Sequence, residues 1–374
     1  MTCTMDWSGL LPELMELMLD RLTHISDHFH FASVCSSWKS VTIKYGYHRR
    51  HLPRQLPVLM LPDKDNTEAR NFLSLSSGKC YGFHIPEIHR KWCGGSSQGW
   101  LITVDESTGE IQLFNPVSRS RVLLPSLSTF YLQPEYIEDP HPSDYISKAA
   151  LSANPCRTLD YVILAIVGHD EKLAYYQSGA DKWINMRTNL ILFEDVIYYK
   201  GLFYAVCYYG AVLSYDFSFE PPIETLITGR STEGRTCDMY YLVESLGELL
   251  LVLRHFNDTV PNKTVRFEVC KLDERKREWI QMKSIGDRIL FLGYGCSTSI
   301  AAQDFPECKR NSIYFNDDYC YRFLDPPIRY RDIGVFDFEN ESVESFYDDS
   351  LSTWTTPSYW ITPIYPYLFH CIEA

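Results

Sequence analysis

A recurring hairpin unit constrains the fold of this 374-residue chain more than any other feature of its sequence. Each copy has a hydrophobic strand, a polar turn and a bulky apolar residue seven or eight positions further on. The copies are ITVDESTGEIQLFNPVSRSRVLLP (Phe114, Val122), LAYYQSGADKWINM (Tyr176, Trp183), VCKLDERKREWIQM (Leu272, Trp279) and VFDFENESVESF (Phe338, Phe346), with a half copy, YAVCYYGAVLSYDF, ending near Asp216. Because a single hairpin cannot bury its own faces, we expect the copies to stack on one another.

The spacing of the copies indicates the architecture of this β-rich part. They recur roughly every 40–65 residues, which fits propeller blades with inserted loops. About 300 residues at ~40–50 per blade predict six or seven blades. The 26 tyrosines and 20 phenylalanines also favour strands. A sandwich of stacked hairpins is the competing architecture.

The N-terminal segment follows a helical pattern instead. Residues 10–22 read LLPELMELMLDRL, with Pro12 suited to a first helical turn. A second helix is expected after Asp27. The apolar positions at helical spacing are Leu14, Leu17, Met18 and Leu22 in the first helix and Phe31, Val34, Cys35, Trp38 and Val41 in the second. We therefore predict a small all-α module at 6–50, a linker at 51–70 and a large all-β domain at 71–374.

The helical module resembles an F-box. The family pattern opens its first helix with Leu-Pro, continues with spaced aliphatic residues and places Val-Cys-x-x-Trp on a later helix. The matching or corresponding positions are Leu11, Pro12, Leu14, Leu17, Met18, Leu22, Val34, Cys35 and Trp38. The resemblance implies that these residues bind the Skp adaptor and, through it, a cullin. Met18 stands where isoleucine is commoner, and His28 and His30 stand where arginines are frequent.

The body carries a second resemblance, which extends over nearly the full chain. It rests on the segments GSSQGWL, LFNPVSRSRVLLP, VIYYKGLFYAV, YLVESLGELLLV, KSIGDRILFLG and NSIYFNDD. In this order they are similar to plant F-box proteins with a domain of unknown function 295, often described as kelch-like. The double glycine of true kelch repeats is absent apart from Gly94-Gly95. The family implies a subunit of an SCF ubiquitin ligase without implying a substrate.

Charge and cysteine usage exclude several partners. The formal net charge is −13, so nucleic acid is not expected as a partner. Residues 1–51 hold five acids and five bases, so the excess acid lies in the β-rich part. No signal-like or membrane-spanning segment is found, and the twelve cysteines include no C-x-x-C pair. We expect a soluble protein of the cytoplasm or nucleus with no membrane partner.

Three sequence patterns resemble catalytic or metal-binding sites. Ser97 lies in a G-x-S-x-G sequence, but a strand-like WLITV follows where a nucleophile elbow needs a helix. Cys80, His84, His89 and Cys93 match no common zinc spacing. The pairs Asp317-Asp318 and Asp348-Asp349 lack a calcium-loop pattern and are expected to be solvated turns. We predict no catalytic residue, metal or cofactor.

The sequence thus predicts a non-enzymatic substrate-recognition adaptor of a cullin ubiquitin ligase, which directs ubiquitin-dependent degradation of an unknown protein target. One alternative is a β-propeller enzyme or carbohydrate-binding module with an incidental helical N-terminus. Another is an F-box scaffold that does not direct degradation. The residues that bind the target cannot be identified from the sequence.

Overall fold

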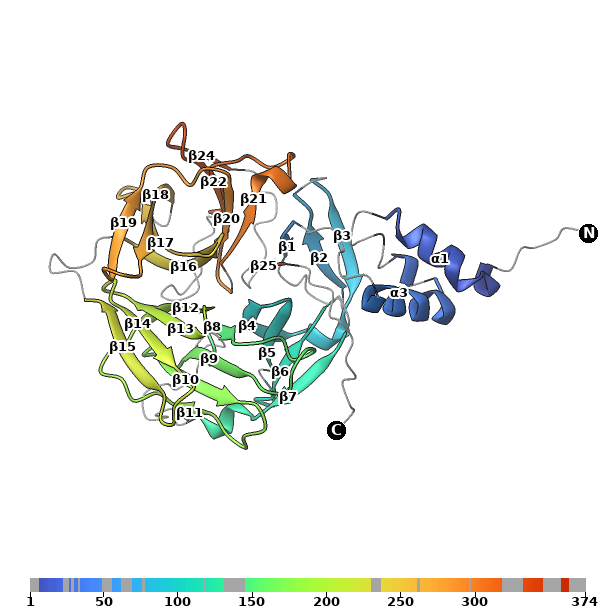
Figure 1. Ribbon diagram of the computed structural model, residues 1–374, viewed down its shortest axis with the longest axis horizontal. Helices are drawn as coiled ribbons and strands as arrows, with labels where there is room; N and C mark the ends of the chain where they lie inside the picture. The colour runs from blue at the N-terminus through green and yellow to red at the C-terminus, as the bar shows by residue number, and fades with distance from the viewer. Residues whose placement is uncertain are drawn as a thin grey trace, which may run out of the picture.

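The computed structural model describes residues 7–22, 27, 30–32, 34–48, 56–61, 69–75, 78–105, 107–116, 119–130, 145–229, 237–260, 263–295, 297–317, 332–345 and 358–362. Within them, six β-sheets stand around a common centre (Figure 1). The helices α1 (Pro12–Leu19) and α3 (Ser36–His48) lie outside this ring, beside the first blade. The predicted architecture, a small helical module followed by a β-propeller, is confirmed, with six blades.

We number the blades from the N-terminus and give their strands from the centre outward. Blade 1 contains β25 (Tyr359–Ile361), β1 (Val58–Met60), β2 (Ala69–Leu73) and β3 (Cys80–His84). Blade 2 contains β4 (Lys91–Ser97), β5 (Trp100–Asp105), β6 (Ile111–Phe114) and β7 (Arg121–Leu124). Blade 3 contains β8 (Lys148–Leu151), β9 (Val162–Val167), β10 (Lys172–Gln177) and β11 (Ile184–Asn185).

The second half of the ring is built in the same way. Blade 4 contains β12 (Phe193–Tyr199), β13 (Leu202–Cys207), β14 (Val212–Asp216) and β15 (Ile223–Thr228). Blade 5 contains β16 (Met239–Ser245), β17 (Glu248–Phe256), β18 (Thr264–Asp273) and β19 (Glu278–Met282). Blade 6 contains β21 (Thr298–Ala301), β20 (Arg288–Leu292), β22 (Ser312–Phe315), β23 (Gly334–Asp337) and β24 (Ser342–Ser345), with β20 and β22 paired in parallel. Short 3-10 helices occur at η1 (Trp7–Gly9), η2 (Pro86–Ile88), η3 (Leu127–Thr129) and η6 (Ala302–Asp304).

In three blades the first two strands are joined by a tight turn of two residues, the second of which is glycine. Gln98-Gly99, Lys200-Gly201 and Leu246-Gly247 each connect a central strand to the next one and have positive φ at both positions. Two such residues form the turn that matches the twist of a two-stranded hairpin, and glycine takes that conformation without steric cost. This geometry accounts for the glycine that GSSQGWL, VIYYKGLFYAV and YLVESLGELLLV each carry before their second strand.

The repeat found in the sequence corresponds to the outer hairpin of a blade. The four full copies form β6–β7, β10–β11, β18–β19 and β23–β24. In two of them the bulky residue joins its blade to the preceding one. The Trp183 indole donates to the Pro125 carbonyl at 3.0 Å, and the Trp279 indole donates to Thr228 Oγ1 at 3.1 Å. These two hairpins therefore pack against the neighbouring blade through their bulky residue.

The two ends of the propeller sequence close the ring. β25 pairs antiparallel with β1, which places Leu59 opposite Trp360. The Trp360 indole also donates to the Leu292 carbonyl of blade 6 at 3.0 Å. The last described strand thus belongs to the first blade, and it is held by the sixth.

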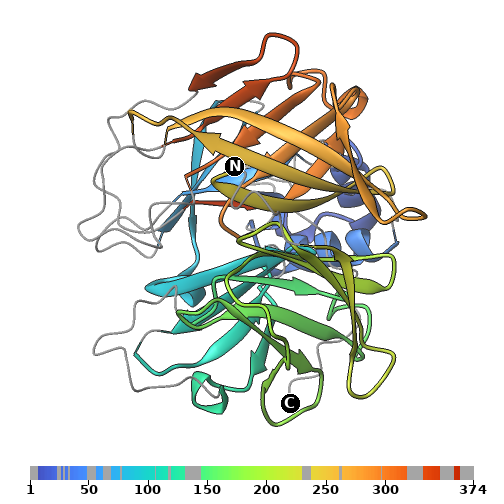
Figure 2. The ribbon, with the colours of Figure 1, turned by 90° about the vertical axis from the view of Figure 1, so that its left-hand side faces the viewer.

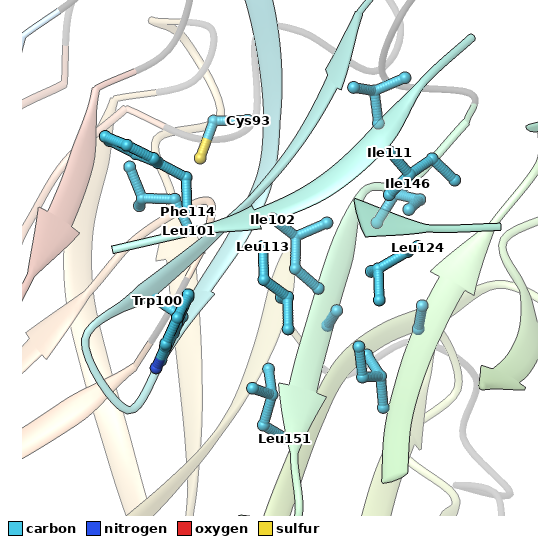
Figure 3. Packing of buried hydrophobic residues seen from close by; sticks show 14 of the residues in the cluster. Cys93, Trp100, Leu101, Ile102, Ile111, Leu113, Phe114, Leu124, Ile146 and Leu151 are labelled. Carbon is cyan, nitrogen blue, oxygen red and sulfur yellow. The ribbon is translucent and has the colours of Figure 1, made fainter. Parts of the chain in front are cut away.

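The hydrophobic core lies mainly between blades. Figure 3 shows the part between blades 2 and 3, where Ile102 and Leu113 lie close to Ile146 and Leu151. Trp100 is fully buried there, and its indole donates to Asn154 Oδ1 at 3.0 Å. Figure 2 shows the ring from the side, with the blue helices behind the sheets.

Two sequence-based boundaries need correction. The predicted linker at 51–70 contains β1 and the beginning of β2, so the propeller begins by Val58. The second predicted helix is interrupted, because Val34 and Cys35 are not helical and α3 begins at Ser36. The chain turns there, with the Val34 N–H donating to the Phe31 carbonyl at 3.3 Å. No helix in the described part of the chain is long and apolar enough to cross a membrane.

Candidate functional site: an exposed apolar helix face

Helix α1 is apolar on two of its faces. Met15 and Leu19, one turn apart, are each 1% exposed and point into the helical module. Leu11 is 63% exposed and Leu17 is 60% exposed, and Leu14 and Met18 are exposed beside them. Pro12 occupies the first helical position, where a missing N–H costs nothing. The exposed set, which we call the α1 face, consists of Leu11, Pro12, Leu14, Leu17 and Met18.

The buried face of α1 packs on a small aromatic core. The buried members of this core are Met15, Leu19, Phe31, Trp38 and Val41. The rings of Phe31 and Trp38 are 4.3 Å apart between centroids. The Trp38 indole donates to the Trp7 carbonyl at 2.8 Å, which ties η1 to α3. These contacts hold α1 at a fixed position while its other face remains exposed.

The structure divides the nine residues that the sequence assigned to adaptor binding. Leu11, Pro12, Leu14, Leu17 and Met18 lie on the α1 face, and Val34 is also exposed. Leu22 and Cys35 are half-buried against the aromatic core, and Trp38 is buried within it. The sequence assigned Trp38 to adaptor binding, but the structure buries its side chain, so Trp38 supports the module from inside instead.

Sequence reasoning missed two features of this module. Met15 and Leu19 form the buried face of α1, and their spacing of four residues was the available signal. Trp7 is a large exposed side chain one turn before α1. Its exposure could not be recognised, because tryptophan side chains are highly buried on average.

The module contacts the propeller at blade 1. The His30 ring stacks on Phe83 of β3 with 6.4 Å between centroids. Phe83 in turn packs edge-on against Phe72 of β2. Figure 1 shows α1 and α3 beside β3, outside the ring. The propeller and the α1 face are therefore parts of one molecule that can contact different partners.

The structure places Ser97 in a hairpin, not in a nucleophile elbow. Ser97 ends β4, and the Gln98-Gly99 turn leads directly into β5. The Ser97 Oγ accepts the Leu151 N–H of the neighbouring blade at 3.1 Å. The serine therefore satisfies a backbone donor at the junction of blades 2 and 3.

The residues considered for metal binding differ in their exposure to solvent. Cys80 and His84 lie exposed on β3, whereas Cys93 is buried in β4. Burial raises the pKa of the Cys93 thiol to about 12, so its sulfur stays protonated. In the described part of the chain, no group of three or more His, Cys, Asp or Glu side chains could hold a metal ion. Asp317 is buried, so the expectation of a solvated turn is wrong for this residue. Asp318, Asp348 and Asp349 lie outside the described residues.

A buried ion pair lies between the central strands. Lys148 Nζ of β8 is 3.4 Å from Asp195 Oδ1 of β12, and both side chains are nearly inaccessible to solvent. Asp195 also accepts the Leu242 N–H of β16 and the Val196 N–H, at 2.8 and 2.9 Å. Burial raises the pKa of Asp195, while Lys148 and the two N–H groups oppose that rise. The Asp195 carboxylate thus links blades 3, 4 and 5, and it accepts the Leu242 N–H at the inner edge of blade 5.

A second buried pair joins blades 5 and 6. Arg254 of β17 lies 3.0 Å from the Asp332 carboxylate and also donates to the Asn316 carbonyl. Its guanidinium lies 4.8 Å from the centre of the Phe315 ring. The Thr264 N–H donates to Asp332 at 2.8 Å. Both buried pairs hold blades together, and each is surrounded by backbone and ring contacts.

The comparisons with known proteins agree with this arrangement. A family model described as the KIB1-4 β-propeller matches residues 72–337. A putative F-box protein of Arabidopsis thaliana is 27% identical over 369 residues, covering 96% of this chain and 97% of its own. The F-box protein SKIP23 of the same plant is 27% identical over 388 residues, covering 91% of each chain. A putative F-box/kelch-repeat protein, also from Arabidopsis thaliana, is 27% identical over 344 residues, covering 83% of this chain and 87% of its own. The chain belongs to the KIB1-4 β-propeller family, and its N-terminal helices fit the small F-box module that the names of its relatives indicate.

Proposed function

We propose that this chain is the substrate-recognition adaptor of an SCF-type cullin ubiquitin ligase. The observation that carries the proposal is the α1 face, a row of exposed apolar side chains on a helix whose opposite side is fully packed. Exposed apolar rows on a rigid helix are typical of surfaces that dock a partner. The relatives are named as F-box proteins, which favours the Skp adaptor as that partner.

In this proposal the propeller recruits a protein target, and no step of ubiquitin transfer is catalysed by this chain. Its contribution is proximity, because holding a target near the ubiquitin-charged enzyme raises the effective concentration of the reacting lysine. The Skp adaptor would connect the chain to a cullin. We place this activity in the cytoplasm or the nucleus. We also assign the chain to the plant F-box proteins with the kelch-like domain of unknown function 295.

Reconstitution tests the proposal directly. The full chain is mixed with a plant Skp adaptor and a cullin, and the complex is followed by size-exclusion chromatography. Co-elution of all three is expected from the wild type, and loss of co-elution is expected from a Leu11→Ser/Leu17→Ser variant. A wild-type chain that elutes apart from a competent adaptor–cullin pair would overturn the proposal.

The same complex separates a degradation adaptor from a scaffold. Proteins bound to the propeller in plant extracts are identified once with the wild type and once with the Leu11→Ser/Leu17→Ser variant. A degradation adaptor makes its partners gain ubiquitin and lose half-life only when the α1 face is intact. Partners that bind equally but keep the same ubiquitin content and half-life would favour the scaffold.

A further inference from the structure

A tight turn in blade 4 presents two neighbouring tyrosines. Tyr208 and Tyr209 lie between β13 and β14, with ring centroids 5.1 Å apart. The turn is closed by the Cys207 N–H, which donates to the Ala211 carbonyl at 3.0 Å, and by the Gly210 N–H, which donates to the Cys207 carbonyl at 2.8 Å. Tyr209 is 39% exposed, which is unusual in a propeller where most aromatic side chains are buried.

The segment that leads into β12 is hydrogen-bonded to this turn. The Tyr208 N–H donates to the Leu192 carbonyl at 2.7 Å, which places the segment before β12 beside the tyrosines. Ile191 in that segment is 44% exposed. Leu192 has a φ of +60°, a left-handed backbone conformation that strains a non-glycine residue. We call Ile191, Leu192, Tyr208 and Tyr209 the blade 4 patch.

The tyrosine turn packs against the next blade. A Cβ added at Gly210 would lie 3.0 Å from the Tyr240 hydroxyl, so the turn rests directly on that side chain. Tyr240 belongs to β16 and is buried. The tyrosines therefore belong to a turn that is already ordered in the absence of a partner, which lowers the entropic cost of binding one.

A turn of blade 3 borders the patch. The Leu192 N–H donates to the Asp170 backbone carbonyl at 3.0 Å, and the Phe193 N–H donates to the Glu171 backbone carbonyl at 2.9 Å. The Asp170 side chain is more than half exposed and pairs with Lys172 at 2.9 Å, so the Asp170 carboxylate lies on the surface beside the patch. The whole net charge of −13 lies in the β-rich part, because residues 1–51 are balanced. Such a surface attracts cationic partners, and tyrosine rings also bind Arg and Lys side chains.

We propose that the blade 4 patch docks the target protein through a segment in which an arginine or lysine lies next to an apolar residue. The apolar side chain would pack on Ile191 and Leu192, and the cation would lie over the tyrosine rings within reach of Asp170. This inference rests on the proposed function, because it supplies the target-binding surface of the same adaptor. Tyrosine, the residue at the centre of the patch, is enriched among residues that dominate binding energy.

A selection with random peptides tests the proposal without knowledge of the target. A displayed library of random 12-residue peptides is selected on the full-length chain, and enriched peptides are synthesised for affinity measurements. The variants are Tyr209→Ala/Ile191→Ser, which removes the exposed apolar contacts, and Tyr209→Arg, which adds a repelling cation. Leu246→Ser is the control, because Leu246 is also an exposed apolar residue in a tight turn. It lies at the opposite face of the ring, at the end of β16 where the Tyr199 hydroxyl donates to the Gly247 carbonyl.

The expected result is enrichment of peptides with Arg or Lys beside an apolar residue. Their affinity should fall at least tenfold in both patch variants, weaken with added salt and stay unchanged in the Leu246→Ser control. Absence of enriched peptides, enrichment without cations, or equal binding to the patch variants would overturn the proposal. Adaptor affinity is measured on the same variants and should not change. A chain that binds these peptides but no Skp adaptor would overturn the proposed function and leave the patch as a peptide-binding surface.

Discussion

The Trp38 indole N–H donates to the Trp7 carbonyl at 2.8 Å, across 31 residues of sequence. This bond joins the segment before α1 to the helix that closes the module. Trp38 is buried and its ring packs at a tilt against Phe31, so it cannot contact a partner itself. It instead fixes the position from which Leu11 and the rest of the α1 face begin.

Substitution of Trp38 should therefore act through the stability of the module. Trp38→Phe keeps most of the ring packing and removes the bond to Trp7, which we expect to cost about 1 kcal/mol. Trp38→Ala also leaves a cavity and should cost about 3–5 kcal/mol. Proteolysis of the helical module under native conditions measures both effects. Equal protease resistance of all three proteins would show that Trp38 is not part of the core.

The Lys148–Asp195 pair predicts non-additive substitutions. Lys148→Met leaves the buried Asp195 carboxylate without its cation, which should lower the free energy of unfolding by about 3–5 kcal/mol. Lys148→Met/Asp195→Asn should recover a large part of that loss, because the amide oxygen can still accept an N–H bond from β12 or β16. Chemical denaturation of the two single variants and the double variant gives the coupling free energy. Additive losses would mean that the two charges do not depend on each other.

A buried carboxyl in blade 6, paired with a partly exposed lysine, predicts a pH dependence. The Lys309 ammonium lies 2.9 Å from Asp337, and the hydrogen bond it donates lowers the pKa of that carboxyl below its ordinary value of 3.8. The stabilisation is therefore present above pH 3.8 and is lost as the pH falls through the lower folded-state value. Asp337→Asn should lower the free energy of unfolding near pH 7 by about 0.5–1 kcal/mol, discounted because Lys309 is partly exposed. Denaturation at pH 7 and pH 3 should show the difference from wild type shrinking on the acid side. A constant difference at both pH values would contradict this role.

Ser97 provides a test against the enzymatic alternative. Its Oγ accepts the Leu151 N–H, so Ser97→Ala should cost about 1 kcal/mol of stability through an unsatisfied donor. It should leave hydrolysis of a p-nitrophenyl ester at the rate of the wild-type chain. Ser97→Thr keeps an acceptor and serves as the control for stability. Ester hydrolysis that is present in the wild type and lost in Ser97→Ala would instead support Ser97 as a catalytic nucleophile.

The sequence predicted the parts of this fold that depend on local patterns. Outer hairpins were recognisable because Tyr176 and Trp183, like Leu272 and Trp279, each close a turn and pack between blades. Leu17 was recognised through its helical spacing and through the resemblance to the F-box pattern, and Leu11 through that resemblance alone.

Other features could not be predicted from the sequence, because they depend on contacts between residues that are far apart along the chain. Ring closure joins Leu59 to Trp360 through strands of only three residues, too short to give a sequence signal. The partner of Lys148 is 47 residues away, and neither residue stands in a recognisable motif. The interruption at Val34 was missed because Phe31, Val34 and Trp38 keep helical spacing across a turn. Exposure decides which tyrosines can bind a target, and the sequence does not encode exposure locally.

The α1 face is the central claim, and adaptor affinity measures it most directly. Isothermal titration of a plant Skp adaptor into the full chain is compared for the wild type, Leu11→Ser/Leu17→Ser and the control Leu123→Ser/Leu159→Ser. All four residues are exposed, so both variants should keep the thermal transition of the wild type. Burying a leucine contributes about 1.5–3 kcal/mol, so the α1 variant should bind one to two orders of magnitude more weakly or worse. The control should bind as the wild type does. Equal affinity of all three proteins, or no affinity in the wild type, would contradict the assignment of α1 as the adaptor-binding surface.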